Sequence, residues 1–184
     1  MTDRELLERY LGGDVSAFAE LIDRHEKPLI RFAGRYRRGS SLDGGRGWAE
    51  DIVQETFLRL LREARSLDGV ENLSAWLYRV ARNLAIDTNR KEMRMERRHR
   101  LAAATELQPP APCSEEAREV GEIVALKLLG LPANQRDVLI LKIQEGKTYR
   151  EISEITGLSA SNVGYLIHHG LKKLAGELRT AGLV

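Results

Sequence analysis

The segment KTYREISEITGLSASNVGYLIHHGLKK, from Lys147 to Lys173, decides the fold of the C-terminal part of the chain. Thr148 and Glu151 form a T-x-x-E capping box, which starts a short helix by satisfying its first free backbone donors. Gly157 can adopt the left-handed conformation that ends such a helix, and Ser159 can cap the next one. A short helix, a glycine turn and a capped second helix predict a helix-turn-helix unit.

The second helix of this unit has one apolar face and one polar face. The apolar positions expected in the core are Val163, Leu166, Ile167, Leu171 and Leu174. The outward positions carry hydrogen-bonding groups first and cations later, as base reading followed by phosphate contact requires. We therefore expect the following side chains to bind DNA: Ser161, Asn162, Tyr165, His168, His169, Lys172 and Lys173. The adjacent histidines point about 100° apart on a helix, which argues against a shared metal ion.

Helical periodicity continues through the N-terminal half, and no period-2 strand pattern is visible. Gly, Asp and Asn signals divide this half into four expected helices. They cover residues 3–11, about 15–36, 48–64 and a long segment that begins after Asn72. Residues 38–47 are rich in Gly and Ser and are expected to form a loop.

The apolar positions of these four helices predict one hydrophobic core. It should include Leu6, Leu7, Tyr10, Leu11, Phe18, Leu21, Phe32, Val53, Phe57, Leu60, Leu61, Leu73, Leu77 and Ala81. Trp76 is expected to pack there as well. His25 lies on the apolar edge of the second helix, and we interpret it as a structural histidine rather than a ligand.

Three prolines, Pro109, Pro110 and Pro112, interrupt the helical pattern and predict a linker. We expect an all-α protein with two small helical domains, over residues 1–100 and 115–184, joined by a Pro-rich linker over 101–114. The single cysteine, Cys113, lies in this linker and excludes an internal disulfide.

Charge is unevenly distributed, although the net charge of the 184-residue chain is only +2. Residues 76–100 hold eight Lys or Arg and three Asp or Glu, whereas residues 43–71 hold seven acids and four bases. The first stretch is suited to phosphates, and the second to a basic or polar protein surface.

Several classes of protein are disfavoured by missing motifs. The sequence has no G-x-S-x-G, Walker-type or H-E-x-x-H motif, so we expect no enzyme, cofactor or metal. It also has no signal-peptide core and no apolar run of about 20 residues, so we expect a cytoplasmic protein without membrane insertion. From the helix-turn-helix alone, a stand-alone regulator that binds duplex DNA as a dimer remains an alternative.

Three stretches of the sequence carry a resemblance to a known family. AEDIVQETFLRLL (Ala49 to Leu61) and AWLYRVARNLAIDTNRK (Ala75 to Lys91) closely resemble region 2 of extracytoplasmic-function sigma factors, members of the sigma-70 family. LPANQRDVLILKIQEGKTYREISEITGLSASNVGYLIHHGLKKL (Leu131 to Leu174) resembles region 4. The resemblance implies a sigma factor that binds core RNA polymerase and directs promoter recognition, promoter melting and transcription initiation.

The resemblance also implies residue roles. Asp51, Gln54 and Glu55 match the docking surface for the β′ clamp helices, and the β flap is a second implied contact. Residues 67–74 and the following helix match the elements that receive a base flipped from the −10 element. In that helix Tyr78 and Asn83 would line the pocket, Arg79, Arg82 and Arg90 would follow the strand, and Asp87 would orient Asn83 or Arg90. Region 4 would read the −35 element. We expect a monomer off polymerase, and many relatives are held inactive by an anti-sigma factor.

Overall fold

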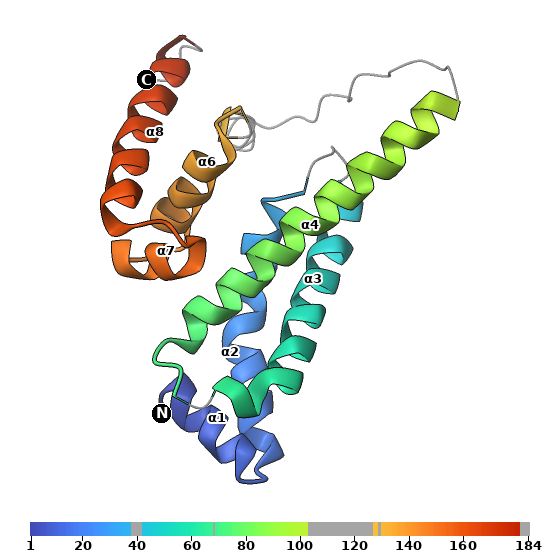
Figure 1. Ribbon diagram of the computed structural model, residues 1–184, viewed down its shortest axis with the longest axis vertical. Coiled ribbons are helices and arrows are strands. Elements are labelled where there is room, and N and C mark those ends of the chain that lie inside the picture. The colour runs from blue at the N-terminus through green and yellow to red at the C-terminus, as the bar shows by residue number, and fades with distance from the viewer. Residues whose placement is uncertain (38–41, 68, 103–126, 129, 181–184) are drawn as a thin grey trace. The chain divides into compact units, whose positions relative to one another are not determined.

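The computed structural model describes residues 1–37, 42–67, 69–102, 127–128 and 130–180. All regular elements within these ranges are helical, so the predicted all-α class is confirmed. The chain divides into two compact units, Met1–Gln108 and Pro109–Val184 (Figure 1). Most of the predicted linker lies outside the described residues, as do Cys113 and the expected start of the second domain at Glu115.

The described residues of the first unit form a bundle of four α-helices and one 3-10 turn. They are α1 (Asp3–Leu11), α2 (Val15–Gly34), α3 (Leu42–Glu63), η1 (Ala64–Leu67) and α4 (Leu73–Ala102). Local hydrogen bonds start three of them, and the caps at α2 and α4 are those that the sequence predicts. Thr2 and Glu5 form a capping box at α1, the Asp14 side chain accepts from the Ser16 N–H, and Asn72 Oδ1 accepts from the Ala75 N–H at 2.9 Å.

The expected loop over residues 38–47 is partly wrong, because α3 already begins at Leu42. Its glycines lower helix propensity by only about 1 kcal/mol each, which tertiary packing can outweigh. Trp48 and Ala49 are buried, and the Trp48 indole Nε1–H donates to Glu92 Oε1 of α4 at 2.9 Å. These contacts anchor the helix close to its N-terminal part.

The core of the first unit lies between α1, α2, α3 and α4. Its fully buried large side chains include Leu6, Leu21, Leu29, Phe32, Leu60 and Leu77. Trp76 is buried as predicted, at 7% exposure. Two expected core residues are instead half-exposed, Leu11 at 38% and Leu61 at 39%. Leu11 is the last residue of α1, and Leu61 lies on a groove that is described below.

The second unit contains the predicted helix-turn-helix. Its described elements are α6 (Ala133–Leu139), the π-helical turn η2 (Ile140–Gln144), α7 (Tyr149–Thr156) and α8 (Ala160–Thr180). The capping box of Thr148 and Glu151 is present, and Gly157 has a positive φ of 75°. Ser159 Oγ accepts from the Asn162 N–H at 3.2 Å. Each of these three local predictions is confirmed.

The core of the second unit is formed by α6, α7 and the buried stripe of α8. Val138, Leu139, Ile152, Ile155 and Val163 have exposures of 1% or less. Leu171 was expected in this core but is 43% exposed, whereas Gly170 is buried. None of the helices in the described ranges is both long and apolar enough to cross a membrane.

Candidate nucleic-acid and protein interfaces

The outer face of α8 presents every side chain that the sequence predicts for base and phosphate contact. Those side chains are all exposed: Ser161, Asn162, Tyr165, His168, His169, Lys172 and Lys173. The rings of Tyr165 and His169, one turn apart, lie 4.2 Å between centroids. The ring of His168 is 5.6 Å from that of His169. The middle of the face is therefore aromatic and hydrogen-bonding, and its C-terminal part is cationic.

Tyr149 belongs to the same surface but comes from α7. A Cβ atom on Gly164 would lie 3.4 Å from Tyr149 Cε2, so the tyrosine ring occupies the space that the glycine leaves on α8. Lys142 Nζ lies 5.4 Å from the centroid of this ring, and the ring is still 43% exposed. Periodicity within α8 could not reveal this residue. The sequence signal that could have indicated it is Gly164, because a glycine directly before the outward-facing Tyr165 leaves space on α8 for a side chain from another helix.

The start of α7 is held by a strong local network. Glu151 Oε2 accepts from the Thr148 N–H at 2.8 Å and from Thr148 Oγ1 at 2.7 Å. Partial burial raises the pKa of Glu151, but the hydrogen bonds from Thr148 and the charges of Lys147 and Lys142 outweigh it, so the pKa is lowered. The ionised carboxylate thus fixes the helix on which Tyr149 is the first residue.

A second polar surface runs along α4. Arg79, Asn83, Asp87 and Arg90 are exposed, and Arg82 is half-buried. Arg82 Nη1 donates to Asn83 Oδ1 at 3.4 Å, which brings a guanidinium and an amide side by side. Arg90 Nη1 lies 3.8 Å from Asp87 Oδ1, and both side chains are more than half exposed. These five side chains form one polar and largely basic helix face.

Tyr78 does not belong to that face, and its expected position on a pocket wall is not what the structure shows. Its side chain is only 3% exposed, and its ring packs at 4.9 Å against Phe32 in the core. Helix α4 contacts α1, α2 and α3, and residues 75–78 are buried in succession, so burial there is not limited to one stripe. A base drawn out of the DNA stack would therefore find no exposed face of the Tyr78 ring on which to stack.

A groove of about 660 Å³ lies between α2 and α3. Its lining is apolar in part, from Ile22 and Ile30 of α2 and from Leu58 and Leu61 of α3. Its polar lining consists of three carboxylates, one amide and one ammonium group, from Glu26, Glu50, Asp51, Gln54 and Lys27. The sequence does not predict that α2 lines this groove. The hydrophobic pattern of α2 alone does not show where α2 and α3 leave a space between them.

The structure separates Glu55 from the two other predicted docking residues. Asp51 and Gln54 are exposed and line the groove, whereas Glu55 is half-buried and does not line it. Glu55 Oε1 lies 3.4 Å from Arg59 Nε and 3.3 Å from Arg62 Nη1. Two cations of its own helix thus already face this carboxylate.

Comparisons with known proteins match a different family model to each of the two units. Residues 21–95 match the family model described as Sigma-70 region 2, and residues 122–174 match Sigma-70, region 4. The chain is 32% identical over 143 residues to the ECF RNA polymerase sigma factor EcfG of Rhodopseudomonas palustris, which covers 77% of each protein. It is 29% identical to the ECF RNA polymerase sigma factor SigW of Bacillus subtilis, over 97% of this chain and 98% of the relative.

Solved structures show the same fold. CnrH, in complex with the cytosolic domain of CnrY, superposes with a TM-score of 0.72 at 24% identity, over 97% of each chain. The sigma factor RpoE of Bartonella quintana, in complex with the anti-sigma factor NepR, gives 0.69 at 23% identity, over 90% of this chain and 98% of that one. The region 2 match accounts for the N-terminal half, which a stand-alone helix-turn-helix regulator would leave unexplained. The chain belongs to the extracytoplasmic-function group of the sigma-70 family, and it is a sigma factor that directs promoter recognition and transcription initiation.

Proposed function

We propose that the two units divide the promoter between them, with α4 on the single-stranded −10 element and α8 on the duplex −35 element. In this assignment residues 1–100 act as region 2 and residues 115–184 as region 4. The observation that carries it is the exposed polar face of one helix in each unit, α4 in the first and α8 in the second, whose opposite face is buried.

The −35 contacts would follow the order of side chains along α8. Asn162 and Tyr165, near the N-terminal end, would lie at base edges in the major groove. Lys172 and Lys173, two turns later, would contact phosphates. Tyr149 would add a neutral hydroxyl from α7, at the point where the first helix of such a unit crosses the DNA backbone.

The −10 contacts would depend on α4. A base drawn out of the stack can be held by an amide on its edge and by a guanidinium plane on its face. Asn83 and Arg82 supply these two groups within 3.4 Å of each other. Arg79 and Arg90, on the same helix, would contact the phosphates of the single strand.

The groove between α2 and α3 is the proposed site for the clamp helices of the polymerase β′ subunit. A helix that presents apolar and basic side chains would complement Leu58, Leu61 and the carboxylates of Glu26 and Asp51. Glu55 would contribute less charge than expected, because Arg59 and Arg62 face it. On the second unit, the exposed Ile143 is a candidate contact for the β flap.

Other parts of the proposal concern the cellular setting. We place the protein in the cytoplasm, as a monomer off polymerase, without a catalytic activity of its own. An anti-sigma factor is a further proposed partner, since RpoE of Bartonella quintana was solved in complex with one.

The test of this function uses purified core RNA polymerase. The full chain should bind core polymerase in a titration, and the resulting holoenzyme should bind a promoter with a pre-melted −10 bubble more tightly than the same promoter as duplex. A protein that binds duplex DNA equally well with and without core polymerase would contradict the proposal.

A further inference from the structure

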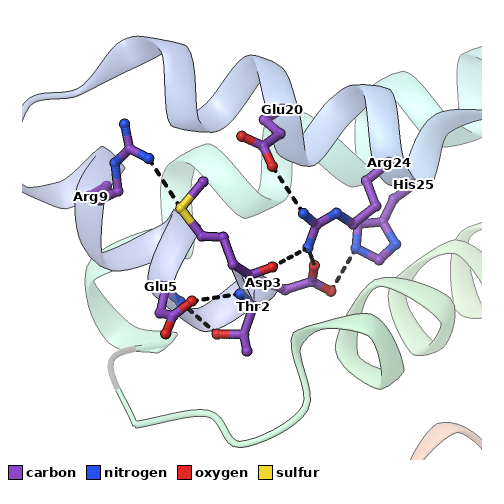
Figure 2. Close-up of polar contacts among 8 residues, drawn as sticks. Thr2, Asp3, Glu5, Arg9, Glu20, Arg24 and His25 are labelled. Carbon is purple, nitrogen blue, oxygen red and sulfur yellow. Dashed lines mark hydrogen bonds and ion pairs between the residues drawn. The ribbon is translucent and has the colours of Figure 1, made fainter.

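The N-terminal helix is attached to α2 through both carboxylate oxygens of a single residue, Asp3 (Figure 2). Asp3 Oδ1 lies 2.7 Å from Arg24 Nη1, and Asp3 Oδ2 lies 2.7 Å from His25 Nε2. The His25 side chain is 9% exposed and that of Asp3 is 19% exposed. This cluster of Asp3, Arg24 and His25 is called the α1 anchor below. His25 is thus the structural histidine that the sequence predicts.

Neighbouring contacts hold the anchor in place. Arg24 Nη2 lies 3.0 Å from Glu20 Oε1, and Arg24 Nη1 also donates to the Met1 carbonyl oxygen at 3.1 Å (Figure 2). Burial raises the pKa of Asp3, but the hydrogen bonds and charges of His25 and Arg24 outweigh it and lower the pKa. Removing Asp3 from its pair with His25, whose side chain is 9% exposed, leaves a largely buried polar group without its partner, which costs more than losing an exposed pair.

The anchored helix packs against more than α2. It also contacts η1 and α4, and Leu6 and Leu7 on its inner side are buried. Leu67 of η1 and Leu73 of α4, which flank the segment from Gly69 to Asn72, are buried as well. Figure 1 shows α1 at the end of the bundle where α4 begins. Helix α1 therefore supports both sides of the turn that leads into the proposed −10 surface.

This helix lies outside the part of the chain that the region 2 family model matches, which begins at residue 21. Arg24 and His25 lie inside the matched part, and Asp3 lies outside it. The α1 anchor thus joins the matched region 2 domain to helix α1, and the family match assigns no role to this helix.

We propose that α1 is a brace for the segment 69–72, and that Asp3, Arg24 and His25 are positioning residues for the reading of the −10 strand. This inference rests on the proposed function of α4. Releasing the anchor lets the first turn of α1 fray, since helix ends open at low free-energy cost when nothing ties them down. The support under residues 69–72 then loosens, and a binding site that is misplaced by about 1 Å loses much of its affinity.

The experiment compares Asp3→Asn, His25→Gln and the double variant in the full chain, assembled with core polymerase. We expect each single variant to weaken binding to the −10 bubble about fivefold or more, and the double variant to be no weaker than either single one. Affinity for core polymerase and for −35 duplex should stay at the wild-type level. Hydrogen exchange should show faster exchange in α1 and in residues 69–72, with α3 and α8 unchanged.

A matched control lies on the same helix. Glu8→Gln removes the Arg4–Glu8 ion pair, whose side chains are 54% and 53% exposed and do not reach α2 through that pair. Such pairs contribute little to stability, so bubble binding should be unchanged. Asp3→Glu, which keeps the carboxylate, should restore part of the lost affinity.

Two results would overturn the brace. One is wild-type bubble affinity in Asp3→Asn although hydrogen exchange shows α1 released. The other is an equal loss of core-polymerase and bubble binding, which would show a general defect of the unit. If wild-type holoenzyme itself does not prefer the bubble, the proposed function of α4 fails, and this outcome is visible before any variant is measured.

Discussion

Gly170 of α8 and Leu139 of α6 are in such close contact that a Cβ atom on Gly170 would lie 2.9 Å from Leu139 Cδ1. Leu139 is completely buried, so its side chain has little room to move. The two helices can approach this closely only because residue 170 has no side chain. A glycine that costs about 1 kcal/mol of helix propensity relative to alanine therefore has a packing role.

Gly170→Ala is expected to destabilise the second unit despite the better helix propensity of alanine. The added methyl group overpacks a closed core, which typically costs about 1–3 kcal/mol and exceeds the gain in propensity. Gly176→Ala is the matched control, because nothing lies within 4 Å of its would-be Cβ in the same helix. Urea unfolding followed by the amide NMR signals of α8 measures both, and a stabilised Gly170→Ala would contradict the prediction.

The same pair of residues shows where the sequence analysis of α8 succeeded and where it failed. The helix, its Ser159 cap and its outward polar face follow from local signals. The buried stripe was expected to include Leu171, but Gly170 takes that place against α6. Glycine has no apolar side chain, so the hydrophobic pattern does not mark Gly170 as buried. The pattern therefore placed the buried position at Leu171, one residue later.

Contacts between helices explain the other differences. Residues 75–78 of α4 are buried in succession, because α1, α2 and α3 all contact this helix. Periodicity predicts one buried face, over Leu73, Leu77 and Ala81, and so it does not show that Tyr78 is buried as well. The groove residues of α2 and the filling of the Gly164 space by Tyr149 likewise depend on how two helices meet, which is not encoded in either helix alone.

Tyr149→Phe should weaken −35 binding by a similar factor for every sequence. The ring that fills the space at Gly164 remains, and only a neutral hydrogen bond worth about 0.5–1.5 kcal/mol is lost. Because no charge is removed, the dependence of log K on log salt should keep its slope, whereas Lys172→Ala should reduce that slope by about one.

The measurement is fluorescence anisotropy of holoenzyme on −35 variants at several salt concentrations. Tyr165→Phe is the control on the base-reading part of the surface, and it should change the preference at particular base pairs. A Tyr149→Phe protein with wild-type affinity throughout would remove Tyr149 from the interface.

Asp51→Lys should weaken binding to core polymerase about tenfold, equivalent to about 1.4 kcal/mol. The substitution reverses a charge in the groove between α2 and α3, and surface changes of this kind leave the fold nearly unaffected. Glu55→Gln should have a smaller effect, because Arg59 and Arg62 already face that carboxylate.

Titration of labelled core polymerase gives these affinities. Glu63→Lys, an exposed charge reversal on α3 outside the groove, serves as the control and should bind like wild type. Equal losses for Asp51→Lys and Glu63→Lys would indicate a general charge effect rather than a docking surface.

Acidification should destabilise the second unit through Glu151. The folded-state pKa of this carboxyl is lowered from its usual 4.5, so its stabilising contribution is fully present above that value. The contribution is lost as the pH falls through the folded-state pKa, because the protonated carboxyl is a weaker acceptor for the Thr148 donors. Glu151→Gln should be less stable than wild type at pH 6, and the difference should shrink towards pH 3. Urea midpoints of the α7 and α8 NMR signals at both pH values measure this, and a constant difference would refute the role of ionised Glu151.

The first unit should read melted DNA in two distinguishable ways. Drawing a base out of the stack costs a few kcal/mol, and the protein must return that energy through contacts that a duplex does not offer. With Tyr78 buried against Phe32, the contacts left are the amide of Asn83 and the guanidinium of Arg82 beside it. Asn83→Ala should therefore abolish discrimination at one base of the −10 element, because an amide reads a base edge. Arg90→Ala should weaken all sequences alike, because a phosphate contact carries no base information.

Tyr78→Phe supplies the control for this experiment. Its ring lies in the core at 3% exposure, so the substitution should leave the −10 sequence profile unchanged even where it alters stability. Binding of holoenzyme to a library of −10 bubbles, each compared with its duplex form, gives the three profiles. If Tyr78→Phe changes base preference while Asn83→Ala does not, the base is held on the opposite side of α4 from the face described above. Equal affinity of wild-type holoenzyme for bubble and duplex would show that neither face reads single-stranded DNA.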